Sequence, residues 1–168
     1  MSRTKLMVAL KDLEHVDDLL KLACHLKSVM EAELTAIHVT EVGPGLPLDI
    51  DVEVLDQAGK EILSRARQIA AQNSVSIATR LLRAHHAGQA LVSEATDQKI
   101  DLLIMGYHCR QGVAEMLFGS TVRYVAQHAP CRVLVEAFLL RSTRYSRRRC
   151  PGWPSLLCLN YLEQLLIP

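Results

Sequence analysis

Residues 102–121 read LLIMGYHCRQGVAEMLFGST: a short apolar run, a glycine, a polar loop and then Gly-Ser-Thr. The apolar run 102–105 is typical of a strand buried on both faces. Ser120 or Thr121 is able to cap a helix that begins there, and the free N–H groups of a helix start bind anions. The stretch therefore predicts a strand, a loop and a helix whose first turn can hold a phosphate. The alternative is that Ser120 is only a helix cap and Gly106 only a turn residue.

The same alternation continues on both sides of this stretch. Further apolar runs predict strands, and apolar residues that recur every three or four positions predict helices between them. The expected strands are 6–10, 34–39, 75–82, 102–105 and 132–135, and the expected helices are 16–30, 55–69, 87–95 and 122–126. Strands separated by helices indicate an α/β domain with a parallel sheet covered on both faces. Ligands of such sheets bind beyond the carboxyl ends of the strands, so the loops after Leu10, Val39 and Met105 are the candidates.

The composition sets limits on the class of protein. The chain has 168 residues, 49% of them hydrophobic and 22% charged, which fits one globular domain. No apolar run is long enough to span a bilayer, and charged residues interrupt the N-terminal apolar run early, so neither a transmembrane segment nor a secretory signal is expected. The five cysteines are widely spaced without a Cys-x-x-Cys pair, which argues against a disulfide framework or a zinc site and favours the cytoplasm.

The composition changes at the end of the chain, so we predict an α/β domain over residues 1–137 and a separate tail over 138–168. The tail holds five Arg and one Glu, all five Arg within 141–149, and it contains Trp153 and several leucines. Because the whole chain carries +1, the first 137 residues carry −3, which argues against nucleic-acid binding by the domain. We expect the tail to be disordered or weakly ordered, with contact to a partner or an anionic surface as one possible role and no role as the other.

Several short motifs, in the right order, resemble the universal stress protein family. Gly106 and Gly119-Ser120 match most of the family's loop G-x2-G-x9-G-[ST], and residues 129–135, APCRVLV, resemble its last strand, A-P-C-P-V-L-V. Residues 101–106, 38–41 and 88–90 also match motifs of the family, and the likeness covers about residues 4–137. The resemblance implies a single doubly wound, Rossmann-like sheet of five parallel strands in the order 3-2-1-4-5. It also implies a homodimer formed through the last strand, by Val133, Leu134 and Val135.

The resemblance further implies a site for ATP or a related adenine nucleotide, with Mg²⁺ accompanying it. The residues that it places at the phosphates are Gly106, Gly119, Ser120 and Thr121, with Arg110 offering positive charge and Cys109 at the position of the second loop glycine. Ala9, Lys11 and Val39 are the residues that it places around the nucleoside.

The sequence departs from the family pattern at two of these positions. Cys109 replaces a glycine, at a cost of roughly 1–2 kcal/mol if the site needs a left-handed backbone. Lys11 stands where nucleotide-binding members have an acidic residue, and an ammonium group cannot accept a hydrogen bond. Three functions therefore stay open: a nucleotide-binding regulator of the stress response, a dimeric interaction module with a degenerate site, and a slow ATPase. No pattern of catalytic or metal-ligating residues is present, so we do not expect an enzyme.

Overall fold

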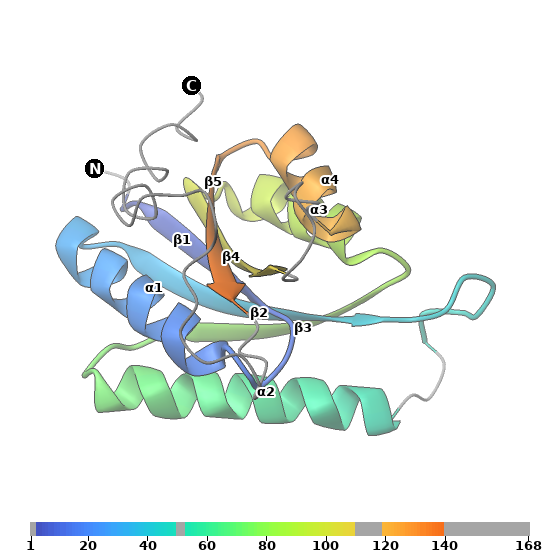
Figure 1. Cartoon of the computed structure of the whole chain (residues 1–168), viewed down its shortest axis with the longest axis horizontal. Coiled ribbons are helices and arrows are strands. Elements are labelled where there is room, and N and C mark those ends of the chain that lie inside the picture. Colours follow the sequence, from blue (N-terminus) through green and yellow to red (C-terminus); the bar gives the residue numbers. More distant parts are fainter. Residues whose placement is uncertain (1–2, 50–52, 110–118, 140–168) are drawn as a thin grey trace, which may run out of the picture.

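A five-stranded parallel sheet forms the middle layer of this computed structural model, which describes residues 3–49, 53–109 and 119–139 (Figure 1). The strands lie in the order β3-β2-β1-β4-β5, and all four neighbouring pairs are parallel, as predicted. The strands are β1 (Lys5–Leu10), β2 (Glu33–Glu41), β3 (Ala78–Ala84), β4 (Leu102–Cys109) and β5 (Arg132–Leu139). The helices are α1 (Val16–Met30), α2 (Glu53–Gln72), α3 (Ala87–Gln98) and α4 (Ser120–His128).

The central strand β1 is buried on both faces because helices cover both. Leu6, Val8 and Leu10 belong to the core under α1 and α2, whereas Met7 and Ala9 face the core under α3 and α4. In Figure 1 the first pair of helices lies below the sheet and the second pair above it. This two-sided burial explains the continuous apolar run of β1, since a one-sided strand would alternate with polar residues.

The order of the strands reverses beside β1. The chain passes from β1 to β2 and β3 on one side, then returns across the sheet through α3 to β4 and β5 on the other. Connections that leave β1 and β4 on opposite faces open a crevice at the carboxyl ends of these two strands. The fold therefore directs attention to the ends of β1 and β4 and to the start of α4.

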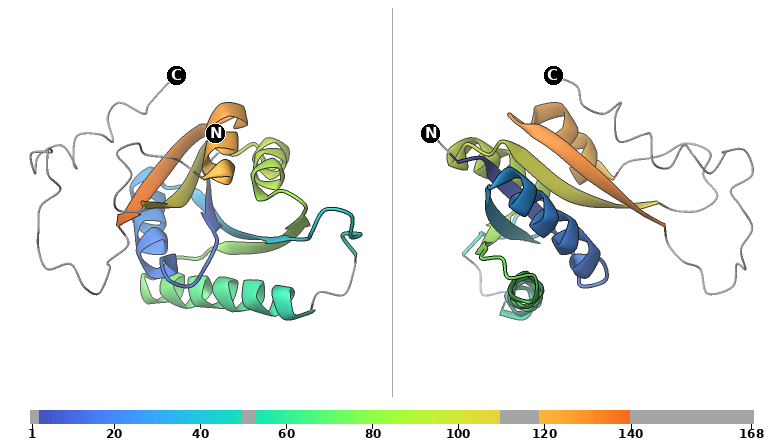
Figure 2. Two further views of the ribbon diagram at one scale, coloured as in Figure 1. Left: turned by 45° about the vertical axis from the view of Figure 1, so that its right-hand side comes forward. Right: turned by 90° about the vertical axis from the view of Figure 1, so that its left-hand side faces the viewer.

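The two strands that exceed the sequence prediction most are β4 and β5, each by four residues. We expected β4 to end at residue 105 and β5 at residue 135, but their pairing continues from Gly106–Glu136 to Cys109–Leu139. The predicted boundary after Ala137 thus lies inside β5. Phe138, which we had assigned to the tail, is a core residue with only 9% of its surface exposed. Figure 2 shows β5 at the outer edge of the sheet.

β3 is displaced toward the carboxyl end relative to the prediction of 75–82. Ser74 has a left-handed backbone with φ of 56°, and the Val75 N–H donates to the Ala70 carbonyl at 2.9 Å. Residues 73–75 therefore form the turn that terminates α2, and the strand begins only at Ala78.

Phe138 occupies the space above Gly106. A Cβ atom at Gly106 would lie 2.8 Å from Cε2 of Phe138 and 3.8 Å from Cδ2 of Leu19. On its other side the Phe138 ring stacks on His15, with ring centroids 4.1 Å apart and planes 3° from parallel. Gly106 has no positive φ, so it is glycine because the ring leaves no room for a side chain. The stack joins β4, β5 and the residue before α1.

Glu136 lies on the same face of β5 as Phe138, since alternate residues of a strand share a face. Its Oε2 atom is buried and has no hydrogen-bond partner among the described residues. Burial raises the pKa of this carboxyl, the nearby Asp18 raises it further, and His15 lowers it. Glu136 is therefore protonated more readily in the folded protein than in the unfolded chain.

We predict that Gly106→Ala lowers the free energy of unfolding by about 1–3 kcal/mol, because the new methyl group overpacks against the Phe138 ring. Gly119→Ala is the matched control: among the described residues beyond its chain neighbours, no atom lies within 4 Å of its Cβ position, and we expect a loss below about 1 kcal/mol. Urea unfolding measures both values. In a Phe138→Leu background the loss at Gly106 should shrink, and an unchanged loss would contradict the packing explanation.

We also predict that Glu136→Gln stabilises the protein at pH 7 but not at pH 4. The raised pKa means that the stability linked to protonated Glu136 is present below its ordinary value of 4.5 and is lost as the pH rises through the folded value. Glutamine is uncharged at every pH. The variant is therefore more stable than the wild type only at the higher pH, where Glu136 of the wild type is ionised. Thermal unfolding at both pH values measures the difference, and Glu33→Gln, at an exposed position, is the control. A lower melting temperature of Glu136→Gln at pH 7 would show that the carboxylate has a stabilising partner.

Candidate functional site

The predicted residues of the first strands and of α4 lie on the same side of the sheet. Ala9 of β1 and Val39 of β2 pack against the core under α3 and α4, which also contains Val122 of α4. Gly119 stands at the N-cap of α4, and Ser120 and Thr121 form its first turn. Because α4 runs back from the carboxyl edge of the sheet, its start lies at the same edge as the ends of β1 and β4. The structure thus brings five of the nine predicted site residues to one edge and one face.

The start of α4 is exposed to solvent, and no side chain among the described residues caps it. Gly119 has φ of −58° and ψ of 158°, and the first turn of the helix has no acidic residue. Gly119 and Ser120 are exposed, and no described residue beyond its chain neighbours lies within 4 Å of the Cβ position of Gly119. The free N–H groups and the positive end of the helix dipole are therefore available to an anion.

The other helix starts in the described part of the chain are supplied with acidic groups. At α3, the Ala87 N–H donates to Oε1 of Glu41 from β2 at 2.8 Å, so a carboxylate already occupies that position. At α1, Asp17 and Asp18 lie in the first turn. The first turn of α3 has no acidic residue of its own either, so its carboxylate comes from Glu41. Among α1, α3 and α4, only α4 has neither an acidic residue in its first turn nor a carboxylate from another described residue.

Lys11 follows β1 directly and is exposed at the edge of the sheet. Asp12, the next residue, accepts a hydrogen bond from the Glu14 N–H at 3.1 Å and so shapes the turn into α1. The charge that the fold places directly after β1 is therefore positive, which suits a phosphate better than a donor group on a base or ribose.

Gly106 is placed differently from the prediction that it borders a phosphate loop. It lies inside β4, paired with Glu136, and its Cβ position faces Phe138 on the α1 side of the sheet. That side is opposite to the one on which Ala9 and Val39 lie. Its requirement for glycine comes from packing, although its backbone stays near the edge where β4 ends.

Tyr107 is a residue of the site that sequence reasoning missed. It is half-buried and packs against the core under α3 and α4, on the same face as Met105 and beyond it toward the carboxyl edge. The period of two through Leu103, Met105 and Tyr107 is the signal that identifies it. Tyr107 was not among the predicted site residues because the strand was predicted to end at residue 105.

His38 fixes the end of β1 from the other side of the sheet. Its Nδ1 donates to the Leu10 carbonyl at 2.9 Å, and the side chain is buried beside Gly59 of α2. This hydrogen bond ties the last residue of β1 to β2 and so holds the start of the Lys11 loop.

The remaining predicted residues are described only in part or not at all. Cys109 is the last residue of β4, but its side chain is not described. Arg110 and the loop up to residue 118 lie outside the described residues, as does the tail from residue 140. In the described ranges no three His, Cys, Asp or Glu side chains gather in a way that would hold a metal. No helix within those ranges is long and apolar enough to cross a membrane.

Comparison with known proteins gives a consistent result. The model of the universal stress protein family matches residues 2–135. A universal stress protein of Methanocaldococcus jannaschii is 33% identical over 121 residues, which cover 68% of this chain and 71% of that protein. A universal stress protein from Archaeoglobus fulgidus, solved in complex with dAMP, superposes with a TM-score of 0.62 at 21% identity over 80% of this chain and 98% of that one. Another, solved in complex with cAMP, gives 0.59 at 20% identity over 82% and 98%.

The superpositions show that this chain shares its fold with these structures, and the family model spans nearly the whole described fold. This chain belongs to the universal stress protein family.

Proposed function

We propose that this protein binds ATP or a related adenine nucleotide at the carboxyl edge of the sheet and acts as a regulatory binding protein in the stress response. The observation that carries the proposal is the contrast between two helix starts. Glu41 occupies the start of α3, whereas the start of α4 is exposed, has no acidic residue in its first turn and is capped by no side chain of the described residues. Two structural neighbours in the family were solved with adenine nucleotides, which supports the same class of ligand here.

The phosphates would lie at the start of α4. The N–H groups of Ser120 and Thr121 point out of the first turn, and both hydroxyl groups can donate to phosphate oxygens. Lys11 adds a positive charge at the neighbouring edge, and Arg110, outside the described residues, is proposed to add another. Mg²⁺ bound to a nucleotide is coordinated largely by phosphate oxygens and water, so it requires no cluster of protein carboxylates.

The nucleoside would lie against the apolar surface between the ends of β1, β2 and β4. Ala9 and Val39 are partly buried there, and Tyr107 adds an aromatic ring on the same face. An aromatic ring stacks on the face of any base and gives little selectivity among bases. Because Lys11 takes the place of an acidic residue, we expect the phosphates to contribute more of the binding free energy than hydrogen bonds to the ribose.

The alternative is a dimeric interaction module whose site no longer binds nucleotide. The cation at Lys11 and the replacement of a loop glycine by Cys109 favour it. A slow ATPase is a third possible function, but we assign no chemical step to this site. Release of ADP from bound ATP would identify ATPase activity.

We predict that equilibrium dialysis detects ATP binding at or below millimolar ATP and that adenosine, which lacks phosphates, binds at least tenfold more weakly. Ser120→Glu should weaken ATP binding by tenfold or more, because it puts a carboxylate at the phosphate position. A Glu in the first turn stabilises a helix by roughly 0.3–1 kcal/mol, so unfolding would not explain the loss.

Ser120→Gln is the matched control, since it has the same size without the charge and should retain more of the binding. Absence of ATP binding at millimolar concentration would refute the proposed function and leave the interaction module. Equal losses in the two variants would show that size, rather than charge, matters at Ser120.

We further propose that the protein is a homodimer formed through the free edge of β5. An unpaired edge strand of eight residues is a template for pairing with another copy, and Val133, Leu134 and Val135 are only partly buried in the single chain. Sedimentation analysis at micromolar concentration should find a dimer. Val135→Lys should shift it toward monomer with an unchanged circular dichroism spectrum, whereas Val135→Thr should not. A wild-type monomer would contradict this assembly.

A further inference from the structure

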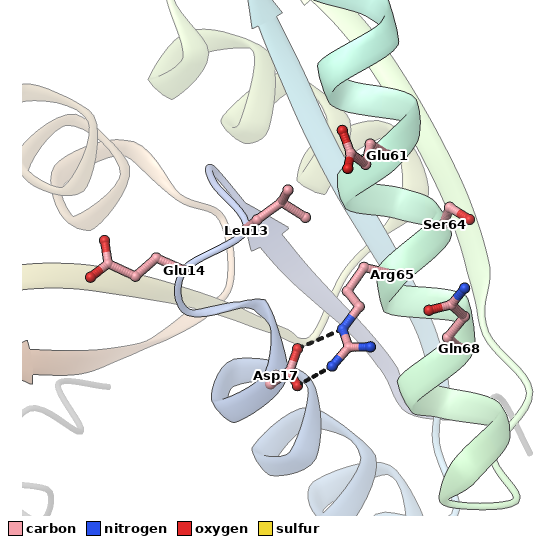
Figure 3. Close-up of a pocket in the computed structure, with 7 residues that line it drawn as sticks. All are labelled: Leu13, Glu14, Asp17, Glu61, Ser64, Arg65 and Gln68. Atoms are coloured by element: carbon pink, nitrogen blue, oxygen red, sulfur yellow. Dashed lines mark hydrogen bonds and ion pairs between the residues drawn. The ribbon is translucent and has the colours of Figure 1, made fainter.

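A polar cleft lies between the start of α1 and the middle of α2, on the face of the sheet away from the candidate site (Figure 3). Three carboxylates line it, from Glu14, Asp17 and Glu61, together with the guanidinium of Arg65. Its lining therefore has a net charge of −2. Lys21 lies one turn further along α1 and is not part of the lining.

The single cation of the cleft is already neutralised. Arg65 donates from Nε to Oδ1 of Asp17 at 2.9 Å and from Nη2 to Oδ2 at 2.5 Å, which makes a two-point ion pair. This pair lowers the pKa of Asp17, so its carboxylate stays ionised. Glu14 and Glu61 are exposed, and their side chains form no hydrogen bond or ion pair with a described residue, so their carboxylates are the two charges available to a ligand.

The cleft also has an apolar side. Leu13 is 46% exposed, one of a few large apolar side chains with so much exposed surface in the described ranges, and it points toward α2 in Figure 3. Glu14 points the other way, away from α2. A ligand that combines positive charge with aliphatic stems matches such a surface, and arginine side chains have both features.

The structure shows where such a segment begins. Phe138 stacks on His15, the residue that follows Glu14 in the chain, and β5 ends one residue later at Leu139. Leu139, the last described residue, therefore lies near the start of α1, which borders the cleft. An extended chain covers about 3.3–3.6 Å per residue, so the stretch 141–149 can reach from Leu139 across α1 to α2.

We propose that the segment Arg141–Arg149 of this chain binds the cleft between α1 and α2 of its own domain. Its five arginines and the two unpaired carboxylates are complementary in charge, and a guanidinium can bind a carboxylate through two parallel hydrogen bonds. Attachment beside the cleft raises the effective concentration of the segment, so weak ion pairs suffice to hold it. The docking involves the face opposite to the candidate nucleotide site and does not depend on nucleotide binding.

Limited proteolysis of the full chain with trypsin tests this docking, because trypsin cleaves after arginine and must wait for the segment to leave the cleft. At low salt the 141–149 segment should be cleaved slowly, and at high salt rapidly, since salt screens exposed ion pairs. The double variant Glu14→Gln/Glu61→Gln should be cleaved roughly fivefold faster at low salt, as expected for the loss of two exposed ion pairs.

The control is Glu33→Gln/Asp97→Asn, which removes two exposed carboxylates outside the cleft and should be cleaved at the wild-type rate. Rapid cleavage of the wild-type segment at low salt would overturn the proposal. So would slow cleavage that is equal in the wild type and the cleft variant. Protection that appears only after addition of vesicles containing anionic phospholipid would assign the segment to a membrane surface instead.

Discussion

The position of β1 between β2 and β4 is the constraint on which the rest of the structure depends. Because β1 is flanked on both sides, the chain must continue toward opposite edges of the sheet, with α1 and α2 on one face and α3 and α4 on the other. Both faces of β1 are then buried, which its continuous apolar sequence satisfies. The same arrangement places the start of α4 beside the ends of β1 and β4, so the geometry of the candidate site follows from the strand order.

Within this frame, individual side chains decide which parts of the edge are available. Glu41 closes the start of α3, and His38 fastens the end of β1, while nothing in the described residues closes the start of α4. The opposite face is closed differently, by the ring of Phe138 between Gly106 and His15. At the carboxyl edge of the sheet, the face under α3 and α4 is thus exposed at the start of α4, whereas the opposite face is packed. Gly106 faces the packed side, toward Phe138.

Local patterns were sufficient to predict the five strands and the four helices, because apolar runs and helical spacing are properties of neighbouring residues. The expected cap of α4 by Ser120 or Thr121 was wrong, because Gly119 is the N-cap and the two hydroxyl residues lie in the first turn. The other failures involve contacts between distant residues. The extension of β4 to Cys109 depends on pairing with β5, and the capping of α3 depends on a side chain 46 residues earlier in the chain. Gly106 fitted a loop motif, whereas its actual reason, the ring of Phe138, lies in a segment that composition assigned to the tail.

The most direct measurement of the central claim is an NMR titration of the backbone amides with ATP. The open start of α4 predicts large, saturable shifts of the Ser120 and Thr121 amide signals, while the Ala87 amide at the start of α3, already bonded to Glu41, stays nearly unchanged. Unmoved Ser120 and Thr121 signals at saturating ATP, or equal shifts at Ala87, would contradict the account.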